Sequence, residues 1–267
     1  MSRISDRFTS LKSQNKTALI PFITAGDPVP EKTVAIMHGL VKGGADIIEL
    51  GVPFSDPMAD GPVIQRASER ALTYNISLHD VLGMVRVFRQ QDNVTPVILM
   101  GYMNPIEVMG YKQFADKASE AGVDGALIVD LPPEEAPDFI AEMRPKGLDQ
   151  VFLIAPTTRG KRLAHICQLA SGFIYYVSLK GVTGSNQLNV EQVSDKLSMI
   201  REHTELPVGV CFGIKDPATA AAVAKVSDAV VVGSALVEHL YQNREQAGEL
   251  PLLAEQFMHN MKSAMDQ

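Results

Sequence analysis

Short apolar runs rich in β-branched residues recur along the chain, and a segment with helical periodicity separates most runs from the next. The runs do not alternate apolar and polar residues, which is typical of strands covered on both faces, as in a parallel sheet wrapped by helices. Eight strands are predicted, over residues 18–24, 45–51, 96–101, 125–130, 151–155, 173–178, 207–212 and 228–233.

The segments between these strands repeat apolar residues at the spacing of one helix face. In residues 31–42 and 78–89, apolar side chains return every three or four positions. Further crossover helices are expected after Asp130, Arg159, Asn189 and Lys215. A leading helix over residues 11–16 and a closing helix over residues 250–267 are expected outside the strand repeat.

The number of units favours a closed barrel over an open sheet. Dividing 267 residues by eight units gives about 33 residues per βα unit, close to the need of a (β/α)8 barrel. A doubly wound open sheet usually has fewer strands and a Gly-x-Gly-x-x-Gly loop, a motif that the chain lacks. No linker or composition shift divides the chain. We predict a single (β/α)8 (TIM) barrel domain over residues 1–267, with an extra N-terminal helix.

Composition and charge narrow the location and the partners. The chain has 24 basic and 31 acidic residues, a net charge of −7, and no Lys/Arg-rich block. Nucleic acid and anionic membranes are therefore not expected as partners. No stretch approaches the ~18 uninterrupted apolar residues of a membrane span, and the N-terminus lacks a signal peptide's apolar run. We expect a soluble, cytoplasmic protein.

The residue types that bind metals form no recognisable site. The six histidines are scattered, with no His-x-His or His-Glu-x-x-His pairing. Cys167 and Cys211 lie among apolar residues and are most simply small buried side chains in a reducing compartment. We expect no metal in this chain.

The second predicted strand carries an acidic residue in apolar surroundings. An ionised Glu49 would be costly there unless it is paired or used. Removal from water raises the pKa of a carboxyl group, which suits a group that exchanges protons near neutral pH. Asp60 follows in a long loop rich in Pro, Ser and Gly, a candidate lid. A structural ion pair for Glu49 and a simple turn for Asp60 remain open.

Glycines cluster at the ends of the last three predicted strands. Gly181 and Gly184 follow the sixth strand, Gly213 the seventh, and Gly233 with Ser234 the eighth, where a helix begins. Glycine lets backbone N–H groups approach phosphate oxygens, and barrels often bind phosphate at these loops. No nucleotide-binding P-loop motif is present. We favour a small phosphorylated ligand over ordinary turn glycines.

Several apolar side chains can line a pocket between the phosphate end and the carboxylates, although such residues are more often plain barrel core. The segments 101–105 and 130–134 suit ordered loops that form an interface or position Asp60, and Asp130 is equally a turn or helix cap. The pocket candidates are Phe22, Met100, Leu127, Leu153 and Tyr175.

The segment 48–61 resembles the signature of the tryptophan synthase α subunit family, which reads apolar-Glu-apolar-Gly-x-x-Phe-Ser-Asp-Pro, then an acidic residue and Gly. Residues 20–28 and 176–184 resemble the family's first strand and its sixth strand with loop, and the resemblance runs from about residue 8 to 240. It implies a (β/α)8 barrel that cleaves indole-3-glycerol phosphate to indole and glyceraldehyde 3-phosphate, a carbon–carbon lyase of tryptophan biosynthesis.

The resemblance also implies roles for single residues. Glu49 would be the acid–base group, Asp60 would accept a hydrogen bond from the indole N–H, and Thr183 would hydrogen-bond Asp60. The remaining roles are indole binding by Phe22, Met100, Leu127, Leu153 and Phe212, and phosphate binding by Gly184, Gly213, Gly233 and Ser234.

The resemblance implies no cofactor in this chain and a pyridoxal-phosphate (PLP) β subunit that consumes the indole, in an α2β2 heterotetramer. The chain departs from the family at Cys211, where Gly is usual and a side chain crowds the phosphate end, and at Leu179, where Arg is frequent.

Two other readings stay open: a non-catalytic or weakly active subunit that activates the β enzyme, and another phosphate-binding barrel isomerase or epimerase. An epimerase of that type would bring metal-ligating histidines to strand ends, where none of the six lies.

Overall fold

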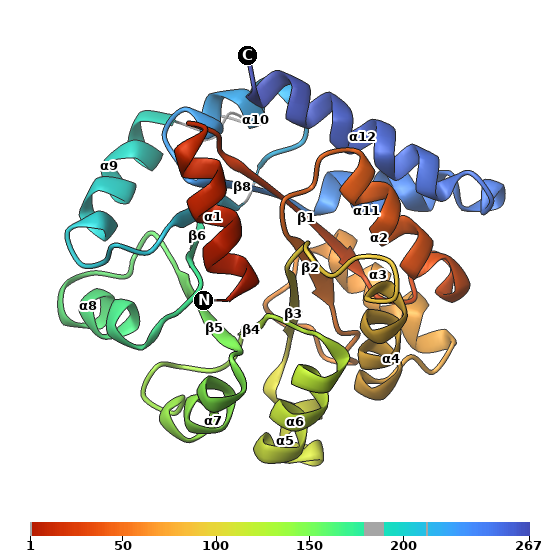
Figure 1. Ribbon diagram of the computed structural model, residues 1–267, viewed down its shortest axis with the longest axis horizontal. Helices are drawn as coiled ribbons and strands as arrows, with labels where there is room; N and C mark the ends of the chain where they lie inside the picture. Colours follow the sequence, from red (N-terminus) through yellow and green to blue (C-terminus); the bar gives the residue numbers. More distant parts are fainter. Residues whose placement is uncertain (1, 179–189, 212) are drawn as a thin grey trace.

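The computed structural model describes residues 2–178, 190–211 and 213–267. Its parallel strands close into one barrel in sequence order (Figure 1), which confirms the predicted (β/α)8 fold. The observed strand bounds differ from the predicted ones by at most three residues. The strands are β1 (Ala18–Thr24), β2 (Ile48–Gly51), β3 (Val97–Gly101), β4 (Gly125–Ile128), β5 (Asp149–Ile154), β6 (Ile174–Val177), β7 (Val208–Cys211) and β8 (Ala229–Val232).

Helices surround the barrel, and every crossover helix expected from the sequence is present. The outer helices are α2 (Thr33–Lys42), α3 (Pro62–Thr73), α4 (Leu78–Phe88), α5 (Met103–Met109), α6 (Tyr111–Ala121), α7 (Pro137–Met143), α8 (Gly160–Leu169), α9 (Val190–Arg201), α10 (Pro217–Ala224), α11 (Ser234–Gln242) and α12 (Leu250–Met265). Three of them, α3, α5 and α6, were not among the predicted helices. Short 3-10 turns lie at Pro30–Lys32, Arg144–Lys146 and Arg244–Gln246.

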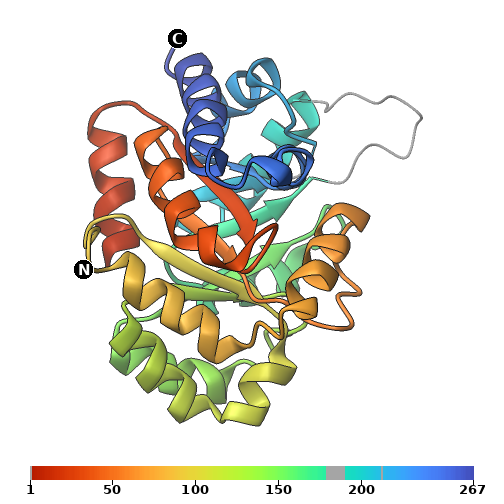
Figure 2. The ribbon, with the colours of Figure 1, turned by 90° about the vertical axis from the view of Figure 1, so that its right-hand side faces the viewer.

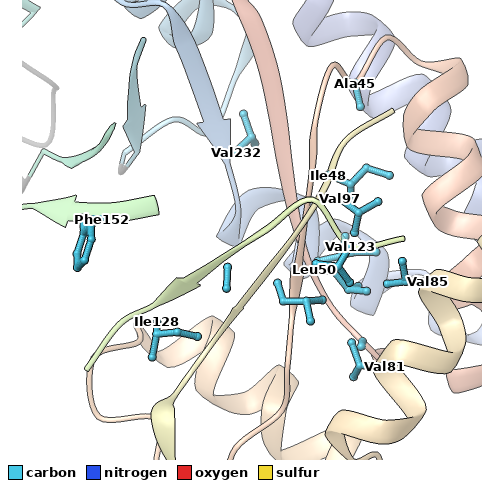
Figure 3. Packing of buried hydrophobic residues seen from close by; sticks show 14 of the residues in the cluster. Ala45, Ile48, Leu50, Val81, Val85, Val97, Val123, Ile128, Phe152 and Val232 are labelled. Atoms are coloured by element: carbon cyan, nitrogen blue, oxygen red, sulfur yellow. The ribbon is translucent and has the colours of Figure 1, made fainter. Parts of the chain in front are cut away.

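Alternate residues of each strand face the barrel interior and the surrounding helices. In β2, Ile48 and Leu50 belong to the outer apolar layer, and Figure 3 shows Val81 and Val85 of α4 pointing toward that layer. Ile47, just before the strand, belongs to the interior cluster. Because strand side chains have a period of two, Glu49 faces the interior with Ile47.

The predicted N-terminal helix exists, but its predicted bounds of 11–16 are wrong. The helix α1 (Arg3–Ser13) starts eight residues earlier, where the Ser2 side chain accepts a hydrogen bond from the backbone N–H of Ser5. It ends before Asn15, whose positive φ of 53° is incompatible with a right-handed helix. The early apolar spacing and the serine cap are the signals that define it.

The position of α1 also differs from the expectation of a helix outside the barrel. Ile4, Phe8 and Leu11 share one helix face and join the interior cluster, with the Phe8 ring centroid 5.7 Å from that of Phe173. The helix therefore closes one end of the barrel, and Figure 2 shows it at the opposite end from α3. The carboxyl ends of the strands remain for the site, as is usual in such barrels.

Within the described residues, no helix combines the length and the apolar character needed to cross a membrane.

Candidate active site

Glu49 lies at the centre of the candidate site, fully enclosed by the barrel. Its side chain is 1% exposed, and the hydroxyl of Tyr175 on β6 donates a hydrogen bond to Oε2 at 3.3 Å. The pKa of Glu49 is raised to about 8. Burial is the largest cause, the hydrogen bond from Tyr175 opposes it, and the negative charge of Asp60 adds to it. Glu49 is consequently mostly a neutral carboxylic acid at pH 7.

Asp60 sits in the loop between β2 and α3 and is held by Tyr102, the residue that directly follows β3. The Tyr102 hydroxyl donates to Asp60 Oδ2 at 3.0 Å and accepts from the backbone N–H of Ala59 at 3.0 Å. The Tyr102 ring stacks on Phe54, with centroids 5.1 Å apart. Burial raises the pKa of Asp60, and the hydrogen bond from Tyr102 partly offsets this. The 101–105 segment thus positions Asp60.

A small cleft at the mouth of the barrel is lined by Asp60 and Tyr102, while Glu49 lies below it in the barrel interior. Phe22 and Met100 pack there against apolar residues of α3 and α11. A Cβ atom on Gly51 would lie 2.6 Å from the tip of the Phe22 ring, so only glycine lets this ring lie over β2. The cleft is lined by Phe22, Thr24, Gly51, Val52, Asp60, Ile64, Ser68, Met100, Gly101, Tyr102 and Val129.

Three further pocket candidates lie deeper than this cleft. Leu127 is fully buried and Leu153 partly buried in the interior cluster. Tyr175 is also buried, beneath Glu49, where it serves the carboxyl group rather than the surface of the cleft. Cys211 packs with the same interior cluster and is a hydrogen-bond neighbour of Tyr175, so its side chain lies at the barrel interior and not only toward the predicted phosphate end.

The predicted phosphate end is represented by β7 and β8. Gly213 has a φ of 79°, a left-handed backbone that favours glycine. Gly233 caps the N-terminus of α11, and Ser234 is the first, exposed residue of this helix. The first backbone N–H groups of a helix have no partners within it and attract anions. Thr183, Gly184 and Phe212, which complete the predicted set, lie outside the described residues.

Sequence reasoning missed Tyr102 as the partner of Asp60 and Thr24 as a residue of the cleft. Tyr102 directly follows the third strand, and Thr24 is a polar residue at the end of the first strand. Polar residues at the carboxyl ends of barrel strands are the signal that finds both. Asp130 accepts a hydrogen bond from the Met103 backbone N–H at 2.8 Å, and so caps α5 rather than a helix of its own segment.

Within the described parts of the chain, no group of three or more His, Cys, Asp or Glu side chains is placed to hold a metal ion. The described residues of the candidate site supply two carboxyl groups, two tyrosine hydroxyls and a helix N-terminus. Together with the fold, these groups define a (β/α)8-barrel protein with a candidate acid–base site at the carboxyl ends of its strands.

The chain belongs to the tryptophan synthase alpha chain family, whose model matches residues 8–266. It is 56% identical to the tryptophan synthase alpha chain of Thioalkalivibrio sulfidiphilus over the whole of both chains. It is 61% identical over 248 residues to that of Ralstonia nicotianae, covering 92% of this chain and 94% of the relative.

Solved structures agree with this assignment. The alpha subunit of tryptophan synthase from Legionella pneumophila superposes with a TM-score of 0.93 at 47% identity, covering 100% of this chain and 99% of the other. A chain of tryptophan synthase from M. tuberculosis, in an aminoacrylate-bound form, gives 0.86 at 33% identity, over 98% and 100%.

Proposed function

We propose that the protein is a carbon–carbon lyase that cleaves indole-3-glycerol phosphate into indole and glyceraldehyde 3-phosphate in tryptophan biosynthesis. The observation that carries the proposal is the neutral Glu49 inside the barrel with Asp60 close enough to raise its pKa. Two carboxyl groups in different environments, one fully buried and one held by Tyr102, suit separate roles in one reaction. Family membership supports the choice of substrate.

The reaction needs a proton at one carbon and the loss of a proton from one hydroxyl. Protonation of indole C3 converts the ring into an electron sink, and the bond from C3 to the glycerol carbon then breaks. The side-chain hydroxyl on that carbon loses its proton and becomes the aldehyde. A neutral Glu49 donates the first proton and, once ionised, accepts the second, so that the group is regenerated.

Asp60 stabilises the positive charge that develops on the ring nitrogen. Its carboxylate accepts a hydrogen bond from the indole N–H, and the charge interaction strengthens as C3 is protonated. The Tyr102 hydroxyl, by donating to Asp60 Oδ2, favours the ionised form and holds it in place. This assigns Glu49 and Asp60 as the catalytic residues.

The remaining site residues bind the two ends of the substrate. Phe22 and Met100 provide apolar contacts at the mouth of the barrel, and Leu127 and Leu153 support the ring from the interior. Gly213, Gly233 and Ser234 bind the phosphate at the N-terminus of α11. The contacts with the ring and the phosphate are completed, in this proposal, by Phe212, Thr183 and Gly184, which lie outside the described residues.

We further propose that the chain works without a cofactor of its own and binds a PLP-dependent β subunit in a cytoplasmic α2β2 heterotetramer. Two exposed apolar side chains belong to segments next to the site residues: Met58, in the loop that carries Asp60, is 83% exposed, and Val108 of α5, the helix that follows Tyr102, is 90% exposed. These two side chains are the candidates for contact with the partner.

Indole formation from indole-3-glycerol phosphate, measured chromatographically with and without an added β subunit, tests the proposal. We expect indole and glyceraldehyde 3-phosphate in equal amounts. Glu49→Gln should lower the rate by about a hundredfold or more, since it removes the proton donor. Asp60→Asn should lower it severely as well, because the developing charge loses its partner.

The matched control is Asp56→Asn, which removes an exposed carboxylate from the same loop as Asp60. In the isolated chain this variant should stay within about twofold of the unaltered protein, since surface substitutions rarely matter. Near-normal turnover of Glu49→Gln would contradict the acid–base assignment. Failure to form indole even with the β subunit would instead favour a non-catalytic partner subunit.

A further inference from the structure

Thr24 is the last residue of β1 and carries a buried hydroxyl that has no hydrogen-bond partner among the described residues. It pairs in the sheet with Gly51 of β2, two residues beyond Glu49. Its side chain is 2% exposed, and Oγ1 has no partner in the described structure. Buried hydroxyl groups are normally hydrogen-bonded, and one that is not costs free energy. The sequence retains this cost at a position next to the site.

The unpartnered hydroxyl borders the same cleft as Asp60. Thr24, Asp60 and Tyr102 line it together, and most of the other lining side chains are apolar. Besides Thr24 and Tyr102, Ser68 of α3 is the one further residue with a hydroxyl among the described residues of this cleft. Because strand residues two apart face the same side, Thr24 follows Phe22 toward the mouth of the barrel.

The hydroxyl proton of Thr24 needs an acceptor, and the chemistry of the cleft leaves one. If the protein has the proposed function, the ligand group that reaches this cleft is the indole ring N–H. This group is a hydrogen-bond donor and cannot accept a hydrogen bond from Thr24. The Tyr102 hydroxyl is already engaged, donating to Asp60 and accepting from Ala59. Asp60 uses Oδ2 for Tyr102, while Oδ1 accepts no hydrogen bond from a described residue.

We propose that Thr24 is a positioning residue for Asp60. Once substrate occupies the cleft, the Thr24 hydroxyl donates a hydrogen bond to the Asp60 carboxylate. This rests on the proposed function, in which Asp60 binds the indole N–H. The carboxylate is then held by two hydroxyls from two different strand ends, Thr24 after β1 and Tyr102 after β3. A carboxylate with two donors keeps its charge and one orientation as the ring becomes positive.

Thr24→Val tests the inference, since valine has the same shape without the hydroxyl. We expect kcat/KM to fall about tenfold, the scale of one hydrogen bond to a charged group. Loss of a donor to Asp60 in the substrate complex should also move the acidic limb of the pH profile of kcat toward higher pH. Thr24→Ser, which keeps the hydroxyl, should restore most of the activity and the position of that limb.

Thermal unfolding of the free protein separates this role from a structural one. Because the hydroxyl has no partner among residues 2–178, 190–211 and 213–267, Thr24→Val should not lower Tm. A lower Tm, or equal activity of the valine and serine variants with unchanged pH profiles, would overturn the role of Thr24 alone. An unaltered protein that forms no indole would overturn the proposed function and this inference with it.

Discussion

At the scale of single residues, the central feature is a carboxylic acid kept neutral by its surroundings. Glu49 lies in a strand whose neighbours are apolar, and full burial is the largest cause of its raised pKa. Tyr175 opposes the shift through one hydrogen bond, and Asp60 adds to it through its charge. The same side chain would be an ordinary carboxylate if it faced water.

The raised pKa makes the stability of the fold depend on pH. Below about pH 4.5, Glu49 is protonated in both the folded and the unfolded chain and contributes nothing. Between about 4.5 and about 8 the unfolded chain ionises first, so that stability falls as the pH rises; above about 8 the loss is constant.

Glu49→Gln should remove this pH-dependent loss, since the amide does not titrate and can still accept from Tyr175. We expect the variant to gain stability relative to the unaltered protein by roughly 2–5 kcal/mol between pH 5 and pH 9. Urea denaturation at the two pH values measures the difference. If Glu49→Gln changed the free energy of unfolding equally at pH 5 and at pH 9, Glu49 would already be ionised in the folded protein at pH 5.

At the scale of elements, residues from neighbouring strand ends assemble the site. The loop after β2 brings Asp60, Tyr102 follows β3, and α11 begins directly after β8. Continuous apolar runs predict the strands well, and they predict that Glu49 lies in apolar surroundings. They do not predict α5, a helix of seven residues whose first backbone N–H bonds to Asp130, 27 residues away. Short helices that depend on distant caps carry a weak local signal.

The N-terminus of α11 provides a prediction about the phosphate. Ser234→Asp should raise the KM for indole-3-glycerol phosphate by about tenfold or more, because a carboxylate replaces a neutral group beside the anion. The same aspartate interacts favourably with the helix dipole, by about 0.3–1 kcal/mol, so folding should not suffer. Steady-state kinetics and Tm measure the two effects.

Ser234→Asn is the matched control, because asparagine has the size of aspartate without its charge, and it should raise the KM much less than Ser234→Asp does. If Ser234→Asp changed the KM no more than Ser234→Asn does, the phosphate would bind elsewhere. Gly213 is less suitable for this purpose, because its φ of 79° would strain any side chain introduced there.

At the scale of the whole molecule, one buried carboxylate joins both terminal helices to the barrel. Asp46, 1% exposed, pairs with Arg7 of α1 and with Lys262 Nζ of α12 at 2.9 Å. It also accepts a hydrogen bond from the backbone N–H of Leu19 at 2.8 Å. Because one side chain connects the two ends of the chain, we propose that residues 1–267 form a single domain.

Asp46→Asn should destabilise the fold by about 3 kcal/mol, because a buried carboxylate that binds two cations and an N–H loses its charge. Chemical denaturation followed by circular dichroism measures this. Indole formation by the folded protein should persist, since Asp46 precedes β2, at the end of the strand away from the site.

Lys16→Ala is the control for this variant. It removes the exposed ion pair between Lys16 and Asp266, which also links the N-terminal region with the end of the chain. Exposed pairs contribute about 0–1 kcal/mol. A loss as large as that of Asp46→Asn would show that the link between the chain ends, rather than burial of the charge, decides the stability.

The sequence by itself determined the barrel, the apolar surroundings of Glu49 and the family signature, because apolar runs, helix periodicity and short motifs are local properties of a chain. Only the tertiary structure decided that Glu49 is neutral, through burial and a hydroxyl 126 residues away, and that Tyr102 holds Asp60. The same holds for α1 as the closure of the barrel and for the unpartnered Thr24. These features depend on contacts between residues that are far apart in the sequence, and local sequence patterns do not predict such contacts.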